Sequence, residues 1–271
     1  MDRELSELLS AESGVRLPSG RIVRTDEGEG RQGLWLADEP ARPGMWDEFH
    51  TAYARSGLWP LMLRPLRDEA EFRPWETGEL YSKLITHPDD HDAAGVLREW
   101  WSHYTAHDED DVLTEKERTA VTAPYGLQWP GLAPARPPTA EPDAFAAEYA
   151  DHLLFQYPST RLGLVAAERG ADALATAAWT GPANYTNDTA EVAAVLRSWE
   201  DRFGARVVGA GSAELYLSVA APPTTLDEAL HIAAEHFAFC PDNVWQNSRP
   251  YTLTAYAESL VGFNSWDFWW D

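Results

Sequence analysis

Apolar residues in the second half of the chain recur with two different periods. Strict alternation is typical of strands with one buried face, and short uninterrupted apolar runs are typical of fully buried strands. This pattern predicts strands at 161–167, 206–208, 214–219 and 266–271. The two middle segments flank Gly209 to Ser212 and predict a hairpin, one face of which we expect to contact solvent.

Apolar residues three and four positions apart predict the helices of the same half. Such stripes cover 171–179, 188–203, 225–237 and 253–261. Asp188 with Glu191 is placed to cap the second of these helices, and Gly204 to end it. Thr225 with Glu228 predicts a capping box at the third. The resulting order of strands and helices contains the split βαβ pattern. We therefore expect an α+β fold, a mixed or antiparallel sheet covered by helices, with a ferredoxin-like arrangement and extra helices in the C-terminal part.

The first half of the chain shows the same two patterns less regularly. Residues 15–17 and 21–23 predict a hairpin, 46–56 a helix that ends at Gly57, 58–63 a buried strand, and 93–107 a further helix. Between the halves, residues 123–142 contain six prolines, which fix φ and remove backbone donors. The chain is therefore predicted to comprise an N-terminal α+β part (1–122), an extended connector (123–142) and a C-terminal α+β domain (143–271).

Composition limits the partners and the compartment. Of the 271 residues, 44% are hydrophobic and 13 are Trp, which supplies a large core. The single cysteine, Cys240, excludes an intramolecular disulfide and fits the reducing cytoplasm. No apolar run is long enough for a signal peptide or a membrane span. The net charge of −23 disfavours nucleic acid and anionic membranes as partners and favours a basic protein, unless it only keeps a Trp-rich surface soluble.

Several blocks of the C-terminal half resemble one protein family. RLGLVAAERGADALATAAW, TGPANYTND, VLRSWEDRFGARVVG, LYLSVAAPP, AAEHFAFCPDN and SWDFWWD are similar to segments of the family called domain of unknown function 4253, over about residues 161–271. Upstream, GLWPLML, RPWETGELY and PDDHD look like segments of longer members. The resemblance implies a cytoplasmic bacterial protein of a mainly actinobacterial family. It carries over no activity and no catalytic residue.

Histidine and aspartate residues in the first half are candidate ligands for a divalent metal. The candidates are His87, Asp90, His91, His103 and His107. His103 and His107 are four residues apart and share one face of the predicted helix, but Tyr104 occupies the position where a zinc protease motif needs Glu. The cluster between His87 and Asp111 supports the hypothesis of a metal-dependent hydrolase. The competing interpretation is a solvated acidic loop.

Polar and aromatic residues near predicted helix ends are candidates for contact with a ligand or partner. They are Trp75, Glu76, Trp100, Trp101, Asn184, Tyr185, Asp242, Asn243 and Trp245. Caps and turns favour the same residue types, so a structural role is the competing interpretation. The four tryptophans are also placed to line a cleft for a small ligand.

No catalytic residue is predicted. His231 and His236 lie about 140° apart around one helix, so they cannot share a metal ion. Cys240 follows at the end of that helix, where the dipole and burial both raise a thiol pKa. The leading hypothesis is a non-enzymatic, acidic, cytoplasmic binding protein for a basic protein partner, such as an immunity-type protein or a regulatory adaptor. A metal-dependent hydrolase and a small-ligand-binding protein are the alternatives. No cofactor is expected apart from the divalent metal of the hydrolase hypothesis.

Overall fold

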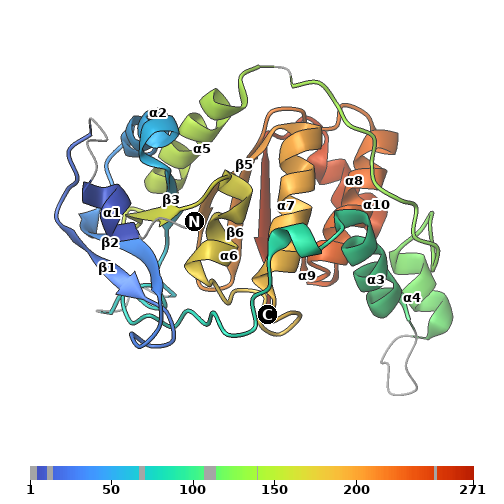
Figure 1. The fold of residues 1–271 in the computed structure, drawn as a ribbon. Coiled ribbons are helices and arrows are strands. Elements are labelled where there is room, and N and C mark those ends of the chain that lie inside the picture. Colours follow the sequence, from blue (N-terminus) through green and yellow to red (C-terminus); the bar gives the residue numbers. More distant parts are fainter. Residues whose placement is uncertain (1–4, 11–14, 67–70, 107–113, 139, 247–248) are drawn as a thin grey trace.

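One seven-stranded sheet runs through the protein in the computed structural model (Figure 1). The structure describes residues 5–10, 15–66, 71–106, 114–138, 140–246 and 249–271. The strand order is β1 (Gly20–Arg24), β2 (Gln32–Pro40), β4 (Arg161–Ala166), β3 (Leu58–Leu63), β5 (Ala205–Ala210), β6 (Glu214–Val219) and β7 (Ser265–Trp269). Neighbouring strands are antiparallel except β3 and β5, which are parallel. The predicted mixed sheet with helices is therefore confirmed.

Strand β4 lies between two strands that precede the proline-rich segment. Leu164 of β4 pairs with Trp35 of β2 on one side and with Pro60 of β3 on the other. The sheet thus takes strands from both predicted parts of the chain. The ferredoxin-like arrangement expected for the C-terminal part is wrong, because that arrangement would place β4 between β6 and β7, whereas β4 lies between β2 and β3 and β7 pairs with β6. The partners of β4 come from distant N-terminal segments, and local periodicity carries no information about them.

Different helices cover the two faces of the sheet. Helices α2 (Met45–Ser56) and α5 (Pro142–Gln156) lie on one side, and α6 (Ala173–Ala177), α7 (Thr189–Phe203) and α8 (Leu226–Phe239) on the other (Figure 1). Adjacent residues of β7 show this arrangement, since successive side chains of a strand point to opposite faces. Asp267 accepts a hydrogen bond from Tyr149 of α5, whereas the Phe268 ring stacks on Trp199 of α7 with 5.4 Å between ring centroids.

The remaining helices are shorter or lie outside these layers. They are α1 (Leu5–Ser10), η1 (Pro88–Asp90), α3 (Ala93–Thr105), α4 (Glu115–Val121), η2 (Gly170–Asp172), α9 (Asp242–Trp245) and α10 (Leu253–Leu260). Helices α3 and α10 pack against α8, and α9 packs between α8 and β7. Among the described helices, none combines the length and apolar character needed to cross a membrane.

Local capping signals set the helix ends that the sequence predicts. Gly57 follows α2 with φ 68° and Gly204 follows α7 with φ 60°, left-handed conformations that favour glycine. Asp188 accepts from the Ala190 amide at the start of α7, and Thr225 forms the predicted capping box at α8. Glu191 does not complete a box at α7 and accepts from the Thr186 hydroxyl.

Three local predictions differ from the structure. Residues 15–17 form no strand, and β1 pairs instead with β2, a strand that the sequence pattern did not predict. Helices α4 and α5 were not predicted either. The hairpin face expected to contact solvent is largely buried, with Tyr216 5% and Ser218 0% exposed, because α5 packs over it.

The proline-rich segment begins with turns at residues 123–127, continues without helix, strand or turn over 129–138, and is tied to α7 and α8 by one buried carboxylate. Its described residues, 123–138 and 140–141, contain no helix or strand. Glu235 of α8 accepts from the Ala133 amide at 2.6 Å and from both terminal nitrogens of Arg202, at 2.8 and 2.6 Å. The Trp199 indole N–H also donates to it, at 2.7 Å. The carboxylate is therefore fully satisfied although its side chain is 0% exposed.

Candidate functional site

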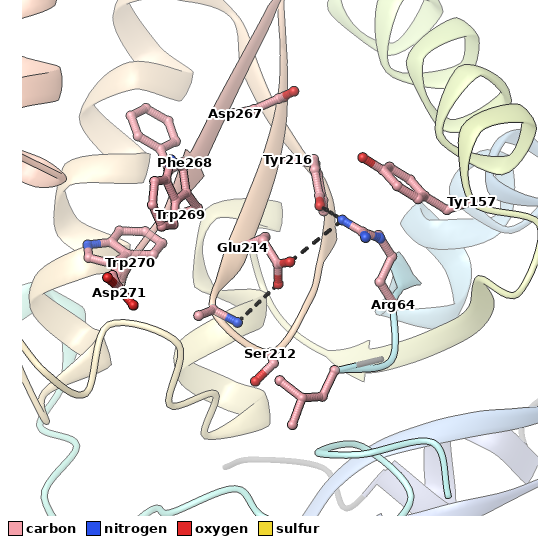
Figure 2. A pocket seen from close by; sticks show the side chains of 12 residues that line it. Arg64, Tyr157, Ser212, Glu214, Tyr216, Asp267, Phe268, Trp269, Trp270 and Asp271 are labelled. Atoms are coloured by element: carbon pink, nitrogen blue, oxygen red, sulfur yellow. Dashed lines mark hydrogen bonds and ion pairs between the residues drawn. The ribbon is translucent and has the colours of Figure 1, made fainter. Parts of the chain in front are cut away.

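A cavity of about 470 Å³ opens where α5 ends short of the β6–β7 edge (Figure 2). Its walls come from three places in the sequence, namely the segment after β3, the residue after α5, and the two strands at the sheet edge. The lining residues are Arg64, Leu66, Tyr157, Ser212, Ala213, Glu214, Tyr216, Asp267, Phe268, Trp269, Trp270 and Asp271. Figure 2 shows Tyr157, the residue after α5, pointing toward Arg64 on one side of the cavity.

Strand register places four of these residues together on the α5 face of the sheet. Glu214 is directly opposite Trp269, and Tyr216 is directly opposite Asp267. Helix α5 covers the Tyr216 end of this group, where the Tyr157 and Tyr216 ring centroids are 6.4 Å apart. Beyond the helix, Trp269 is 38% exposed and the Glu214 side chain 36% exposed. The uncovered part of the floor therefore consists of the Trp269 indole and two carboxylates. Glu214 lies opposite the indole on β6, and Asp267 lies two residues before it on β7.

Arg64 forms one wall and is held in place through both its backbone and its side chain. Its amide donates to the Ala210 carbonyl at 2.9 Å, and its own carbonyl accepts from the Trp75 indole at 2.6 Å. The guanidinium carbon lies 3.4 Å from the centroid of the Tyr157 ring. The guanidinium also donates to the Tyr216 hydroxyl and lies 3.8 Å from Glu214 Oε1 (Figure 2).

Acidic groups outnumber basic ones among the described residues that line the cavity. These are the carboxylates of Glu214, Asp267 and Asp271 and the guanidinium of Arg64. Asp267 is accessible at the surface, yet the surrounding protein atoms raise the pKa of its carboxyl, while the hydrogen bond from Tyr149 opposes that shift. Burial, followed by the charge of Asp267, raises the pKa of Tyr149. The local charge therefore favours a cationic ligand over an anionic one.

Four of the predicted contact residues lie together beside the C-terminal end of β7, namely Asn184, Tyr185, Asp242 and Asn243. The Tyr185 hydroxyl donates to Asp242 Oδ2 at 2.7 Å, and burial followed by this hydrogen bond raises the pKa of Tyr185. The Asn184 amide donates to the Asp271 carbonyl at 2.8 Å. The structure thus brings this loop and the start of α9 together at the end of β7, and their polar atoms bind one another and the strand.

Asn243 and Cys240 cover the outer edge of β7. The Asn243 amide donates to the Asp267 carbonyl at 2.8 Å, and the Cys240 thiol donates to the Trp269 carbonyl at 2.9 Å. Open strand edges invite pairing with other chains, and these side chains occupy the acceptors that such pairing would use. They also fix the two residues whose side chains form the cavity floor.

The predicted tryptophans do not share one cleft. Trp100, Trp101 and Trp245 pack around Phe237 and Phe239 between α3 and α8. Trp101 is fully buried, and its indole donates to the Leu127 carbonyl at 3.2 Å. Trp75 lies elsewhere, under Arg64, and the neighbouring Glu76 forms ion pairs with Arg21 and Arg161. Trp75 therefore supports the cavity wall from behind.

The described members of the predicted metal cluster point to separate partners. His87 Nδ1 accepts from the Asp89 amide and caps η1, which contains Asp90. His91 Nε2 lies 2.6 Å from the Thr86 hydroxyl and 3.5 Å from Asp188 Oδ2. Within the described ranges, no three His, Cys, Asp or Glu side chains gather to hold a metal ion, and the exposed His103 joins no such group. His107 and residues 108–111 lie outside the described residues.

Two groups with nucleophilic or basic chemistry are buried in the core. Burial raises the pKa of the Cys240 thiol, so this sulfur is a hydrogen-bond donor at neutral pH. Burial also lowers the pKa of His236 well below its ordinary value of 6.5, and Nδ1 lies 2.9 Å from the Tyr256 hydroxyl. His231 lies on another face of the helix, beside Tyr125, as its spacing predicts.

The cavity was not predicted from the sequence, although part of its signal is local. Alternation along 214–219 and 266–271 separates Glu214, Tyr216, Asp267 and Trp269 from the core-facing residues. Pairing of the two strands, which brings the polar faces together, was not predicted. Arg64 and Tyr157 carry no local signal that connects them with these strands.

Comparison with known proteins identifies one region of the chain. Residues 161–271 match the family model described as a domain of unknown function (DUF4253). This match confirms the resemblance of the C-terminal part. Comparison with curated proteins and with solved structures gives no match. The DUF4253 region supplies the cavity floor from β6 and β7, whereas Arg64, Leu66 and Tyr157 precede it in the sequence.

Proposed function

We propose that the protein is a non-enzymatic binding protein whose partner is a basic protein that docks over the cavity at the end of α5. The observation that carries this proposal is the cavity floor, an exposed indole with carboxylates on two sides. Exposed apolar side chains at its rim, Leu66 and Trp269, provide contact area of the kind that partners bury. The net charge of −23 would attract a basic protein over longer distances.

The proposal assigns the protein to the cytoplasm, where its single cysteine needs no oxidising environment. It assigns no step of chemistry to Cys240 or His236, because burial favours the neutral form of each. The hydrolase hypothesis uses the His and Asp cluster between His87 and Asp111, whose described members contact separate partners and whose last residues, 107–111, lie outside the described residues. The small-ligand alternative uses the same cavity, and binding experiments separate it from a protein partner.

The test is capture of partners from a native lysate with matched variants. Wild-type protein, Glu214→Gln and Trp269→Phe are compared with Glu258→Gln, which removes an exposed carboxylate on α10 outside the cavity lining. The expected result is a protein of high isoelectric point that binds at low salt, is released at higher salt, and is lost only with the two cavity variants. Equal capture by all four proteins, or capture of no basic protein by the wild type, would refute the proposal.

A further inference from the structure

We infer that the group entering the cavity is an arginine side chain of the basic partner, stacked on Trp269 and paired with Glu214. This inference rests on the proposed function and specifies its chemistry. The two residues face each other across the β6–β7 ladder, so their Cβ atoms are about 5 Å apart on one face of the sheet. Each side chain is more than one third exposed, and a visiting group reaches both from solvent.

The shape of the floor favours a guanidinium over an ammonium. A guanidinium is planar, so it stacks on an indole and presents paired N–H donors to a carboxylate at its edge. An ammonium on a flexible stem acts as a point charge and gains less from a flat surface with acids at its rim. Asp267, two residues from Trp269 on the same strand and face, offers a second carboxylate along the indole.

Arg64 already shows how this cavity holds a guanidinium. Its guanidinium carbon lies over the Tyr157 ring, 3.4 Å from the ring centroid, and its Nη1 lies 3.8 Å from Glu214 Oε1. Glu214 Oε2 accepts from the Ala213 amide at 3.2 Å, and each carboxylate oxygen has capacity for a further donor. Arg64 occupies the Tyr157 wall and leaves the Trp269 side of the floor open.

The charge of the cavity lining favours a cationic ligand over an anionic one. Among the described residues, three carboxylates and one guanidinium line the cavity, and the C-terminal end of α5 next to Tyr157 adds partial negative charge. A visiting anion would bind Arg64 and be repelled by Glu214. A visiting arginine would bind Glu214 and be repelled by Arg64. Removal of Arg64 therefore has opposite effects on the two classes of visitor.

The test compares three blocked tripeptides that differ only in the central residue, which is arginine, citrulline or lysine. Citrulline has nearly the same shape as arginine but carries no charge. Binding is followed by the NMR signal of the Trp269 indole N–H, assigned with Trp269→Phe. We expect the arginine peptide to shift this signal and to bind at least about tenfold more tightly than the citrulline peptide. Glu214→Gln should weaken binding about tenfold, Arg64→Gln should leave it unchanged or strengthen it, and Glu258→Gln should not alter it.

Equal binding of arginine and citrulline peptides, tighter binding of lysine, or loss of binding in Arg64→Gln would overturn the inference. Thermal denaturation of each variant separates lost binding from lost folding. Failure of the inference is distinguishable from failure of the proposed function. If the wild type captures a basic protein through the cavity but the tripeptide leaves the Trp269 signal in place, only the inference fails. If the arginine peptide binds as expected but no basic protein is captured, the proposed function fails and the chemistry assigned to the cavity stands.

Discussion

Replacement of Arg202 by methionine tests the buried network that ties the proline-rich segment to α7 and α8. Arg202 makes two of the four hydrogen bonds to Glu235, and the two side chains are 13% and 0% exposed. Methionine retains the apolar stem that packs near Phe203 but leaves a buried carboxylate with only the Ala133 amide and the Trp199 indole as donors. Removal of one partner of a buried ion pair costs about 3–5 kcal/mol.

The assay is urea denaturation at neutral pH, followed by circular dichroism, with Arg42→Met as the control. Arg42 forms an ion pair with Glu48 at the surface, where its side chain is 60% exposed, so its loss should cost at most about 1 kcal/mol. The double variant Arg202→Met/Glu235→Gln removes the orphaned charge and should recover part of the loss. Recovery is incomplete because the glutamine has one acceptor oxygen, so either the Ala133 amide or the Trp199 indole lacks an acceptor, at about 1–3 kcal/mol.

A loss in Arg202→Met no larger than in Arg42→Met would refute this reasoning. It would mean that water or another side chain replaces the guanidinium. A double variant less stable than Arg202→Met would contradict the assignment of the loss to an unpaired charge.

Three further predictions concern the core. Burial lowers the pKa of His236, so below about pH 6.5 the unfolded chain binds a proton at this residue and the folded protein does not. The free energy of unfolding therefore falls below that pH, by up to about 1.4 kcal/mol per pH unit. His236→Gln should reduce this slope in urea denaturation between about pH 7.5 and about pH 5, and an unchanged slope would contradict it. Gly204→Ala should lower the free energy of unfolding by about 1–2 kcal/mol more than Gly262→Ala. Both glycines have positive φ, but only at Gly204 would the new Cβ lie 3.1 Å from the Ala220 Cβ and the Pro142 Cγ. Equal losses of stability in the two variants would contradict this. The Cys240 thiol should react with a disulfide reagent only as urea unfolds the protein, and rapid reaction without urea would contradict its burial.

Local signals predicted the elements whose ends depend on one or two residues. Gly57 and Gly204 end helices because a left-handed conformation suits glycine, and Thr225 begins one through a capping box. The edge strand β7 was predicted from alternation alone, since Trp266 and Phe268 are buried and their neighbours are exposed. Failures occurred where a distant segment decided the environment, as when α5 buried the hairpin face that the alternation assigned to solvent.

By itself, therefore, the sequence determined the acidity, most helices and strands of residues 161–271, the family resemblance of that region, and the polar faces of β6 and β7. Only the tertiary structure decided that β4 lies between β2 and β3, and that Arg64 and Tyr157 meet Glu214 and Trp269 around one cavity. The physical reason is the range of the interactions. Caps and periodicity act over a few residues, whereas the strand pairing and helix packing around the cavity join segments roughly fifty to a hundred and fifty residues apart, for which no local pattern codes.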